Sequence, residues 1–370
     1  MFRLKTILIC VLVATLLLFG SLLPAGLADS GANHQARNTH FGVSGGNVND
    51  HSSAFCCSGT LGSLVTNGGT QYVLSNNHVL ARSDQAVAGE DISQPGLVDT
   101  ACRPATLVAD FTGAVPLGSN VDAAVAQLRS GQMDSTGFIE DIGVPGSTIV
   151  NPSVGLAIAK SGRTTGFTTG SVSSVNTSVN VQYQKGCNSG KKFTVSYTNQ
   201  VVINSSTFSA GGDSGSLIVT NNTSHNPVAL LFAGSSTTTI GNPIGEVLTK
   251  LSNTLGGSFS FGSGGGVAAP TTRGTVAGER QPFIPGLGGL MPQLPQQAVD
   301  RASAVLEVHR ANLMFQPGVM GAGVGASGRA DGEAAIVIYV NKDSAAKPIL
   351  PDSIEGIPVL VVLTDQFIAF

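Results

Sequence analysis

The stretch SAGGDSGS, residues 209–216, and the apolar run LIV that follows it indicate which other residues of the chain to expect in a functional site. Glycines flank one acidic residue and one serine, so the backbone can turn sharply and present Ser214 beside uncrowded amide N–H groups. Such a loop is suited to displaying a nucleophile. Because a serine hydroxyl is a weak nucleophile at neutral pH, this interpretation requires a general base and an orienting carboxylate elsewhere in the chain.

Two upstream residues fit these roles. His78 stands where the strand-like run TQYVLSNN ends, a position from which a side chain projects into a cleft. Asp122 is the sole charge of GAVPLGSNVDAAVAQL, and a carboxylate buried there needs a donor. The order His78, Asp122, Ser214 is one of the known triad orders. The intervals of 44 and 92 residues match the roughly 45 and roughly 93 of the chymotrypsin template.

Composition favours an all-β body with tight turns. Only 11% of the 370 residues are charged and 48 are glycine, while short β-branched runs alternate with Gly/Asn/Ser turns up to about residue 255. The length allows one large domain and a smaller one. The mild net charge of −3 gives no reason to expect nucleic acid as a partner.

The first 28 residues have the pattern of a secretory signal. Arg3 and Lys5 precede the apolar run TILICVLVATLLLFG, and the small residues Gly26 and Ala28 mark a cleavage site. The alternative is an uncleaved membrane anchor, because the apolar run approaches spanning length. We expect cleavage, export and no stable membrane association afterwards.

Four cysteines remain after such cleavage, namely Cys56, Cys57, Cys102 and Cys187. An even number in an exported chain predicts disulfides, although three connectivities are open. The alternative of a zinc site lacks the CxxC spacing. We therefore expect no metal, and no residue pattern indicates an organic cofactor.

The segments that flank the β-rich body are polar or rich in glycine and proline. Residues 29–54 are unpatterned and predict a lead-in whose His34, His40 and His51 are solvated. Residues 256–297 predict a linker. Residues 298–370 predict a small α+β domain, with one amphipathic helix and three strand candidates. The glycines of GAGVGASG lack the strand-loop-helix context of a phosphate loop, which favours a glycine-rich strand.

Residues 57–255 resemble a bacterial trypsin-like (chymotrypsin-fold) serine peptidase. The resemblance rests on SNNHVLA around His78, NVDAAVA around Asp122, SGRTTGFTTG at 161–170 and SAGGDSGSLIV around Ser214. It implies two six-stranded antiparallel β-barrels, with His78 and Asp122 from the first and Ser214 from the second. It also implies an oxyanion hole made by the backbone N–H groups of Gly212 and Ser214.

The same resemblance implies a substrate pocket with its base near Phe208 and one wall along residues 230–236, including Phe232, Ala233 and Gly234. No carboxylate stands where a Lys/Arg-specific member has one. The cysteine pair that brackets the catalytic histidine in animal members is absent, since Ser63 and Val79 occupy those positions. No activation peptide is evident, so activation by N-terminal insertion is not inferred.

These observations predict an exported serine endopeptidase acting on protein or peptide substrates. The alternatives are a catalytically weak binding protein that keeps the barrels as a scaffold, and an esterase with the same triad. The C-terminal segments GVG, IVIYVNK and IEGIPVLVV resemble a small domain that accompanies some bacterial trypsin-like peptidases. This resemblance implies partner binding, substrate binding or restraint of the protease. A domain of this kind would be separate from the barrels and dispensable for chemistry.

Overall fold

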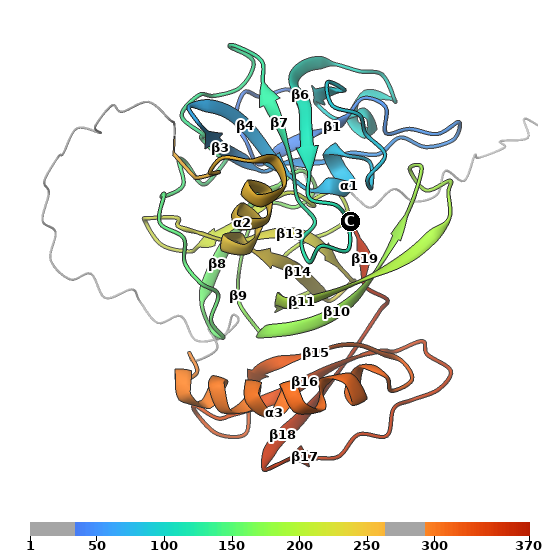
Figure 1. Ribbon diagram of the computed structural model, residues 1–370, viewed down its shortest axis with the longest axis vertical. Helices are drawn as coiled ribbons and strands as arrows, with labels where there is room; N and C mark the ends of the chain where they lie inside the picture. Colours follow the sequence, from blue (N-terminus) through green and yellow to red (C-terminus); the bar gives the residue numbers. More distant parts are fainter. Residues whose placement is uncertain (1–33, 263–292) are drawn as a thin grey trace, which may run out of the picture.

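The computed structural model describes residues 34–262 and 293–370. The predicted signal segment 1–28 and most of the predicted linker lie outside this range. No helix of the described residues is long and apolar enough to cross a membrane. Two stacked β-barrels dominate the molecule, blue to cyan above green to yellow, and a C-terminal α+β unit lies against the second barrel (Figure 1).

The first barrel is a sheet that closes on itself through one bent segment. Its strand order is β2-β1-β5-β6-β7-β4-β3, and all pairs are antiparallel. Only Gly62 separates β2 from β3, so these two strands act as one that turns the corner. The elements are β1 (Val43–Asn47), β2 (Gly59–Leu61), β3 (Ser63–Asn67), β4 (Thr70–Ser75), α1 (Asn77–Leu80), β5 (Asp91–Gln94), the 3₁₀ turn Leu97–Thr100, β6 (Thr106–Ala114) and β7 (Ala124–Leu128).

The second barrel closes in the same way. Its order is β10-β11-β14-β13-β12-β8-β9, and β9 continues into β10 across Val172 and Ser173. Counting each bent segment as one strand, both barrels are six-stranded and antiparallel, which confirms the predicted fold. The elements are β8 (Ala157–Gly162), β9 (Gly166–Ser171), β10 (Ser174–Gln184), β11 (Lys192–Asn204), β12 (Leu217–Thr220), β13 (Pro227–Gly234), β14 (Thr238–Pro243) and the closing helix α2 (Ile244–Leu255).

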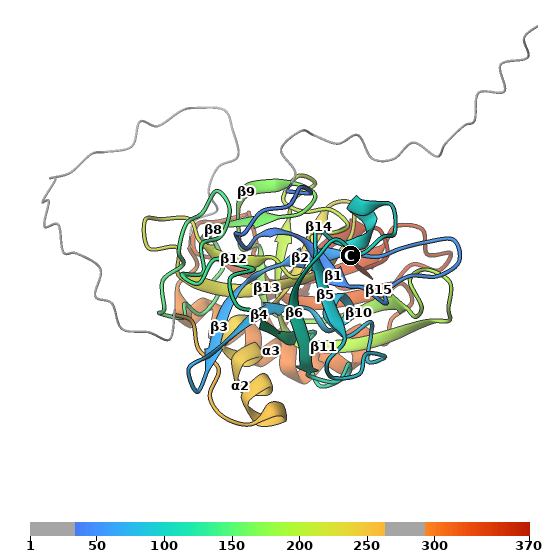
Figure 2. The ribbon, with the colours of Figure 1, turned by 90° about the horizontal axis from the view of Figure 1, so that it is seen from above.

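The C-terminal residues form the predicted α+β unit, one helix packed on a small sheet. Its elements are α3 (Gln296–Met314), β15 (Val319–Ala326), β16 (Ala334–Asn341), β17 (Ser353–Ile354), β18 (Ile357–Thr364) and β19 (Ile368–Ala369). Helix α3 contacts β15 and β16 and buries Val299, Ala302, Leu306 and Leu313. Seen from above, the first barrel lies in front of parts of the second barrel and of this unit (Figure 2).

The sequence suggested that this unit would be separate from the barrels. In the structure the unit and the second barrel are joined. Strand β15 pairs with β10, so the small sheet continues the sheet of the second barrel. One hydrophobic cluster also contains Ile158 and Leu231 of the barrel together with Leu306 and Ile338 of the C-terminal unit. Because edge strands with unpaired backbone groups favour such additions, β15 covers an edge that would otherwise be open.

The prediction that residues 29–54 are an unpatterned lead-in is wrong at 43–47. These residues form β1, which is fully buried and pairs with both β2 and β5. The sequence VSGGN concealed the strand because glycines carry little β-propensity. They are needed here, since a Cβ at Gly45 would lie 2.4 Å from Leu61.

The cysteines form two disulfides, Cys56–Cys102 and Cys57–Cys187. The second connects the first barrel with the loop between β10 and β11. Phe259 and Phe261 are buried against the first barrel, so the predicted linker does not begin at residue 256. Ser260 pairs with Thr66 through two backbone hydrogen bonds.

Candidate active site

His78 and Asp122 meet at the junction of the barrels. His78 lies on the one-turn helix α1 directly after β4, and Asp122 lies just before β7. The His78 Nδ1 is 2.6 Å from Asp122 Oδ2, and the His78 backbone N–H donates to Asp122 Oδ1 at 3.2 Å. Asp122 is fully buried, and its own backbone N–H donates to Asn242 Oδ1 at 2.9 Å. The carboxylate therefore fixes the imidazole with its proton on Nδ1.

Two tyrosines of the second barrel support this carboxylate. The Tyr183 hydroxyl donates to Asp122 Oδ2 at 2.8 Å, which leaves the Tyr197 hydroxyl, 2.6 Å away, to donate to Tyr183. Burial, followed by the charge of Asp122, raises the pKa of Tyr183 well above its ordinary value. Both phenols therefore stay protonated and remain donors. No sequence motif pointed to Tyr183, because it lies 61 residues from Asp122.

The loop that carries Ser214 is held by a buried carboxylate. Asp213 accepts hydrogen bonds from the backbone N–H groups of Thr164, Thr165 and Ala210 and from the Thr165 hydroxyl. The ammonium of Lys160 lies 3.4 Å from Asp213, and both side chains are fully buried. Asp213 therefore holds the loop that carries Ser214. Lys160, which sequence reasoning missed, supplies its counter-charge.

The predicted oxyanion hole has two free amide donors. The Gly211 carbonyl accepts from the Thr164 hydroxyl at 2.7 Å, so the N–H of Gly212 on the same trans peptide points the opposite way. Within the described segments, neither this N–H nor that of Ser214 donates to a protein acceptor. Gly212 has φ +96°, and a Cβ there would lie 2.5 Å from Thr164 Oγ1, so the position requires glycine.

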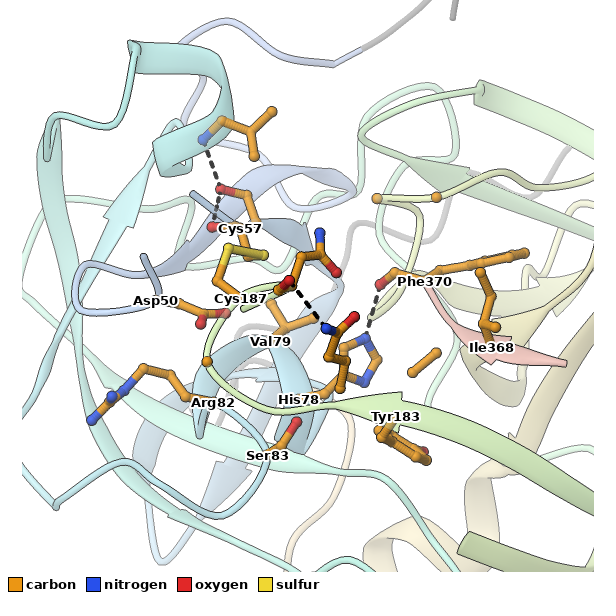
Figure 3. A pocket seen from close by; sticks show the side chains of 18 of the residues that line it. Asp50, Cys57, His78, Val79, Arg82, Ser83, Tyr183, Cys187, Ile368 and Phe370 are labelled. Carbon is orange, nitrogen blue, oxygen red and sulfur yellow. Dashed lines mark hydrogen bonds between the residues drawn. A yellow bond between two sulfur atoms is a disulfide. The ribbon is translucent and has the colours of Figure 1, made fainter. Parts of the chain in front are cut away.

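The predicted nucleophile, Ser214, and the predicted base, His78, are not hydrogen-bonded to each other. The Ser214 hydroxyl donates to the Phe232 carbonyl at 3.1 Å. The His78 Nε2 instead lies 3.0 Å from the carbonyl oxygen of Phe370 (Figure 3). Phe370 comes from the C-terminal unit, 292 residues along the chain. His78 is therefore hydrogen-bonded to Asp122 through Nδ1, while its Nε2 contacts the Phe370 carbonyl and not Ser214.

The four predicted pocket residues have different surroundings. Phe208 is fully buried in the cluster against which the Phe370 side chain packs. The Phe232 ring instead packs on Tyr197, with 4.9 Å between ring centroids, so Phe232 presents its carbonyl to the site. Ala233 and Gly234 offer backbone groups of β13. A Cβ at Gly234 would lie 2.6 Å from the Phe370 ring, so glycine leaves the space that this ring fills.

An open cavity of about 590 Å³ lies beside His78. Its lining includes Asp50, Arg82, Tyr183, Gly212, Phe370 and the 57–187 disulfide (Figure 3). Burial raises the pKa of Asp50 to about 6. Within the described residues, Asp50, Cys57 and Cys187 have atoms close enough to hold a metal. Both sulfurs are bonded to each other, however, so no thiolate ligand is present.

The electrostatics of His78 favour its charged form. Burial by itself lowers the pKa of an imidazole, but the charge and hydrogen bond of Asp122, the Phe370 carbonyl and the charge of Asp50 offset this. The net result is a raised pKa for His78. An imidazole with these neighbours is suited to take a proton from a hydroxyl and to hold it during a reaction.

No protein-family model and no curated protein matches the chain. Similar solved structures include a glutamic acid specific serine protease, with 21% identity, a TM-score of 0.41, and 60% of this chain and 98% of that chain covered. Thermobifida fusca protease A shows 16% identity and a TM-score of 0.39, covering 60% and 99%. Nocardiopsis protease shows 16% identity and a TM-score of 0.38, with 55% of this chain and 92% of that chain covered.

Proposed function

We propose that the chain is a serine endopeptidase that cleaves peptide bonds through an acyl-enzyme intermediate. The observation that carries the proposal is the buried Asp122 bonded to His78, with Ser214 and two free amide donors across the same barrel junction. The signal-like start of the sequence and the two disulfides support an exported protein.

Each residue has a defined role in the proposed reaction. His78 removes the proton of the Ser214 hydroxyl during attack on the scissile carbonyl and returns it to the leaving amine. Asp122 stabilises the imidazolium that forms between these steps. The N–H groups of Gly212 and Ser214 stabilise the negative oxygen of the tetrahedral intermediate. Water then repeats the attack on the acyl-enzyme and releases the acid product.

The pocket should prefer an apolar side chain before the scissile bond and disfavour Lys or Arg. Its surroundings include Phe208, Ala233 and Gly234, and no carboxylate lies among these residues to offset the desolvation of a cation. Profiling on a peptide library measures this preference. A dominant preference for Lys or Arg would show that the pocket is assigned to the wrong residues.

The test of function compares the wild-type protein with Ser214→Ala. Fluorophosphonate should label the wild type and not the variant, and peptide hydrolysis should fall on the order of 10⁴- to 10⁶-fold. Thr220→Ala, a hydroxyl lost elsewhere in the same barrel, serves as the control. Equal hydrolysis by Ser214→Ala would overturn the proposal. If neither the wild type nor a variant lacking residues 368–370 is labelled, the binding-protein alternative is favoured. Turnover of esters without turnover of peptides would favour the esterase.

A further inference from the structure

The last residues of the chain lie in the groove where the proposed substrate would bind. Strand β19 adds to β13 in antiparallel register, with Ala369 opposite Ala233 and Ile368 opposite Gly234. On its other side it pairs with β10, and the Gln182 N–H donates to the Phe367 carbonyl at 2.9 Å. Addition of an extended segment to a sheet edge is a common mode of peptide recognition.

Phe370 completes this arrangement at the catalytic groups. Its N–H donates to the Phe232 carbonyl at 3.4 Å, and its carbonyl oxygen lies 3.0 Å from His78 Nε2. Its ring lies over Gly234 and packs against the cluster that contains Phe208. The backbone and ring of Phe370 therefore take the places that a peptide substrate needs for the residue before its scissile bond, while its carbonyl oxygen contacts His78 instead of the N–H groups of Gly212 and Ser214.

The segment is anchored from behind by the C-terminal unit. The Phe367 ring is fully buried and lies 5.9 Å from the Tyr339 ring. The Thr364 and Ser235 hydroxyls are 2.5 Å apart, and Asp365 pairs with Lys342 at 2.6 Å. These contacts hold residues 366–370 at the groove at high effective concentration, so occupancy does not depend on a tight contact of its own.

We propose that residues 366–370 are an intramolecular inhibitor that binds as the acyl half of a substrate, and that the primary pocket accepts an aromatic side chain. This inference rests on the proposed function. It explains why Ser214 turns to the Phe232 carbonyl while His78 contacts Phe370. It also narrows the expected apolar preference to phenylalanine and residues of similar shape.

The first experiment removes residues 368–370 from the full chain. Hydrolysis of a small peptide with Phe before the scissile bond, and the rate of fluorophosphonate labelling, should both rise about tenfold or more, since an aromatic side chain leaves an apolar site. Phe370→Asp should act similarly because it places a charge in that site, whereas Phe370→Tyr should retain most of the inhibition. Phe315→Ala, which changes a 92% exposed ring of the same unit, is the matched control and should have no effect.

A second experiment does not depend on turnover. A synthetic peptide with the sequence of residues 364–370, TDQFIAF, should bind the Ser214→Ala protein that lacks residues 368–370, and TDQFIAD should bind at least tenfold more weakly. Active wild-type protein whose rates are unchanged by the deletion, or equal binding of the two peptides, would overturn the inference. Selective peptide binding by a protein without any hydrolysis would support the docking site while rejecting the proposed function.

Discussion

Replacing Lys160 with Met should destabilise the protein and disturb the loop of the nucleophile. The Lys160 ammonium is the only cation paired with Asp213 in the described chain, at 3.4 Å with both side chains fully buried. Methionine fills a similar volume, so the substitution removes the charge while leaving little void. Asp213 would then be a buried carboxylate without a counter-charge.

The expected size follows from the contacts that remain. Breaking a buried ion pair by removing one partner costs about 3–5 kcal/mol. Asp213 would keep its donors from Thr164, Thr165 and Ala210, which favours the lower end, about 3 kcal/mol.

Urea unfolding followed by circular dichroism measures this loss. With a slope of about 2 kcal/mol per molar urea, a loss of 3 kcal/mol lowers the midpoint by about 1.5 M. Fluorophosphonate labelling should also slow in native conditions, because Asp213 precedes Ser214. Lys342→Met, at an exposed ion pair with Asp365, is the matched control and should leave the midpoint unchanged. If the Lys160→Met midpoint equals that of the wild type, the pair does not hold this loop.

Three further predictions concern the groups around His78. Asp122→Asn should lower kcat about 10⁴-fold while leaving KM nearly unchanged, because the imidazole is no longer held in the required tautomer. A rise in KM as large as the fall in kcat would point to misfolding. Tyr183→Phe should lower kcat modestly, with a normal unfolding midpoint as the control, and an unchanged rate would show that this hydroxyl is dispensable. Because the charged form of His78 is favoured by Asp122, Phe370 and Asp50, activity should appear only as the pH rises through its raised pKa. Asp50→Asn and deletion of residues 368–370 should each move this acid limb to lower pH, and a limb that stays in place would contradict the reasoning.

The raised pKa of His78 also makes the stability of the folded protein depend on pH. A pKa that is raised in the folded state contributes stability that is fully present below the ordinary imidazole value and is lost as the pH rises through the raised value. A neutral imidazole with its proton on Nδ1 has no Nε2 proton to donate to the Phe370 carbonyl. Rising pH should therefore favour release of the C-terminal segment as well as activity.

The sequence alone determined the β-rich body and the spacing of His78, Asp122 and Ser214, because these depend on local patterns. Short β-branched runs between glycine turns specify strands wherever they are placed, and a glycine-flanked serine specifies a sharp loop. The helix α3 was predictable for the same reason, from the spacing of its apolar residues. In each case the physical cause lies within a few residues of the element it explains.

Tertiary structure decided everything that joins distant residues. The pairing of the four cysteines, the Lys160 counter-charge and the support of Asp122 by Tyr183 all depend on contacts across the barrels. Strand β15 adds to β10 and β19 adds to β13 at open strand edges. Because such an edge can pair with any extended segment of suitable register, the sequence of the added strand carries no local signal of its partner. Only the folded chain therefore places Phe370 against His78.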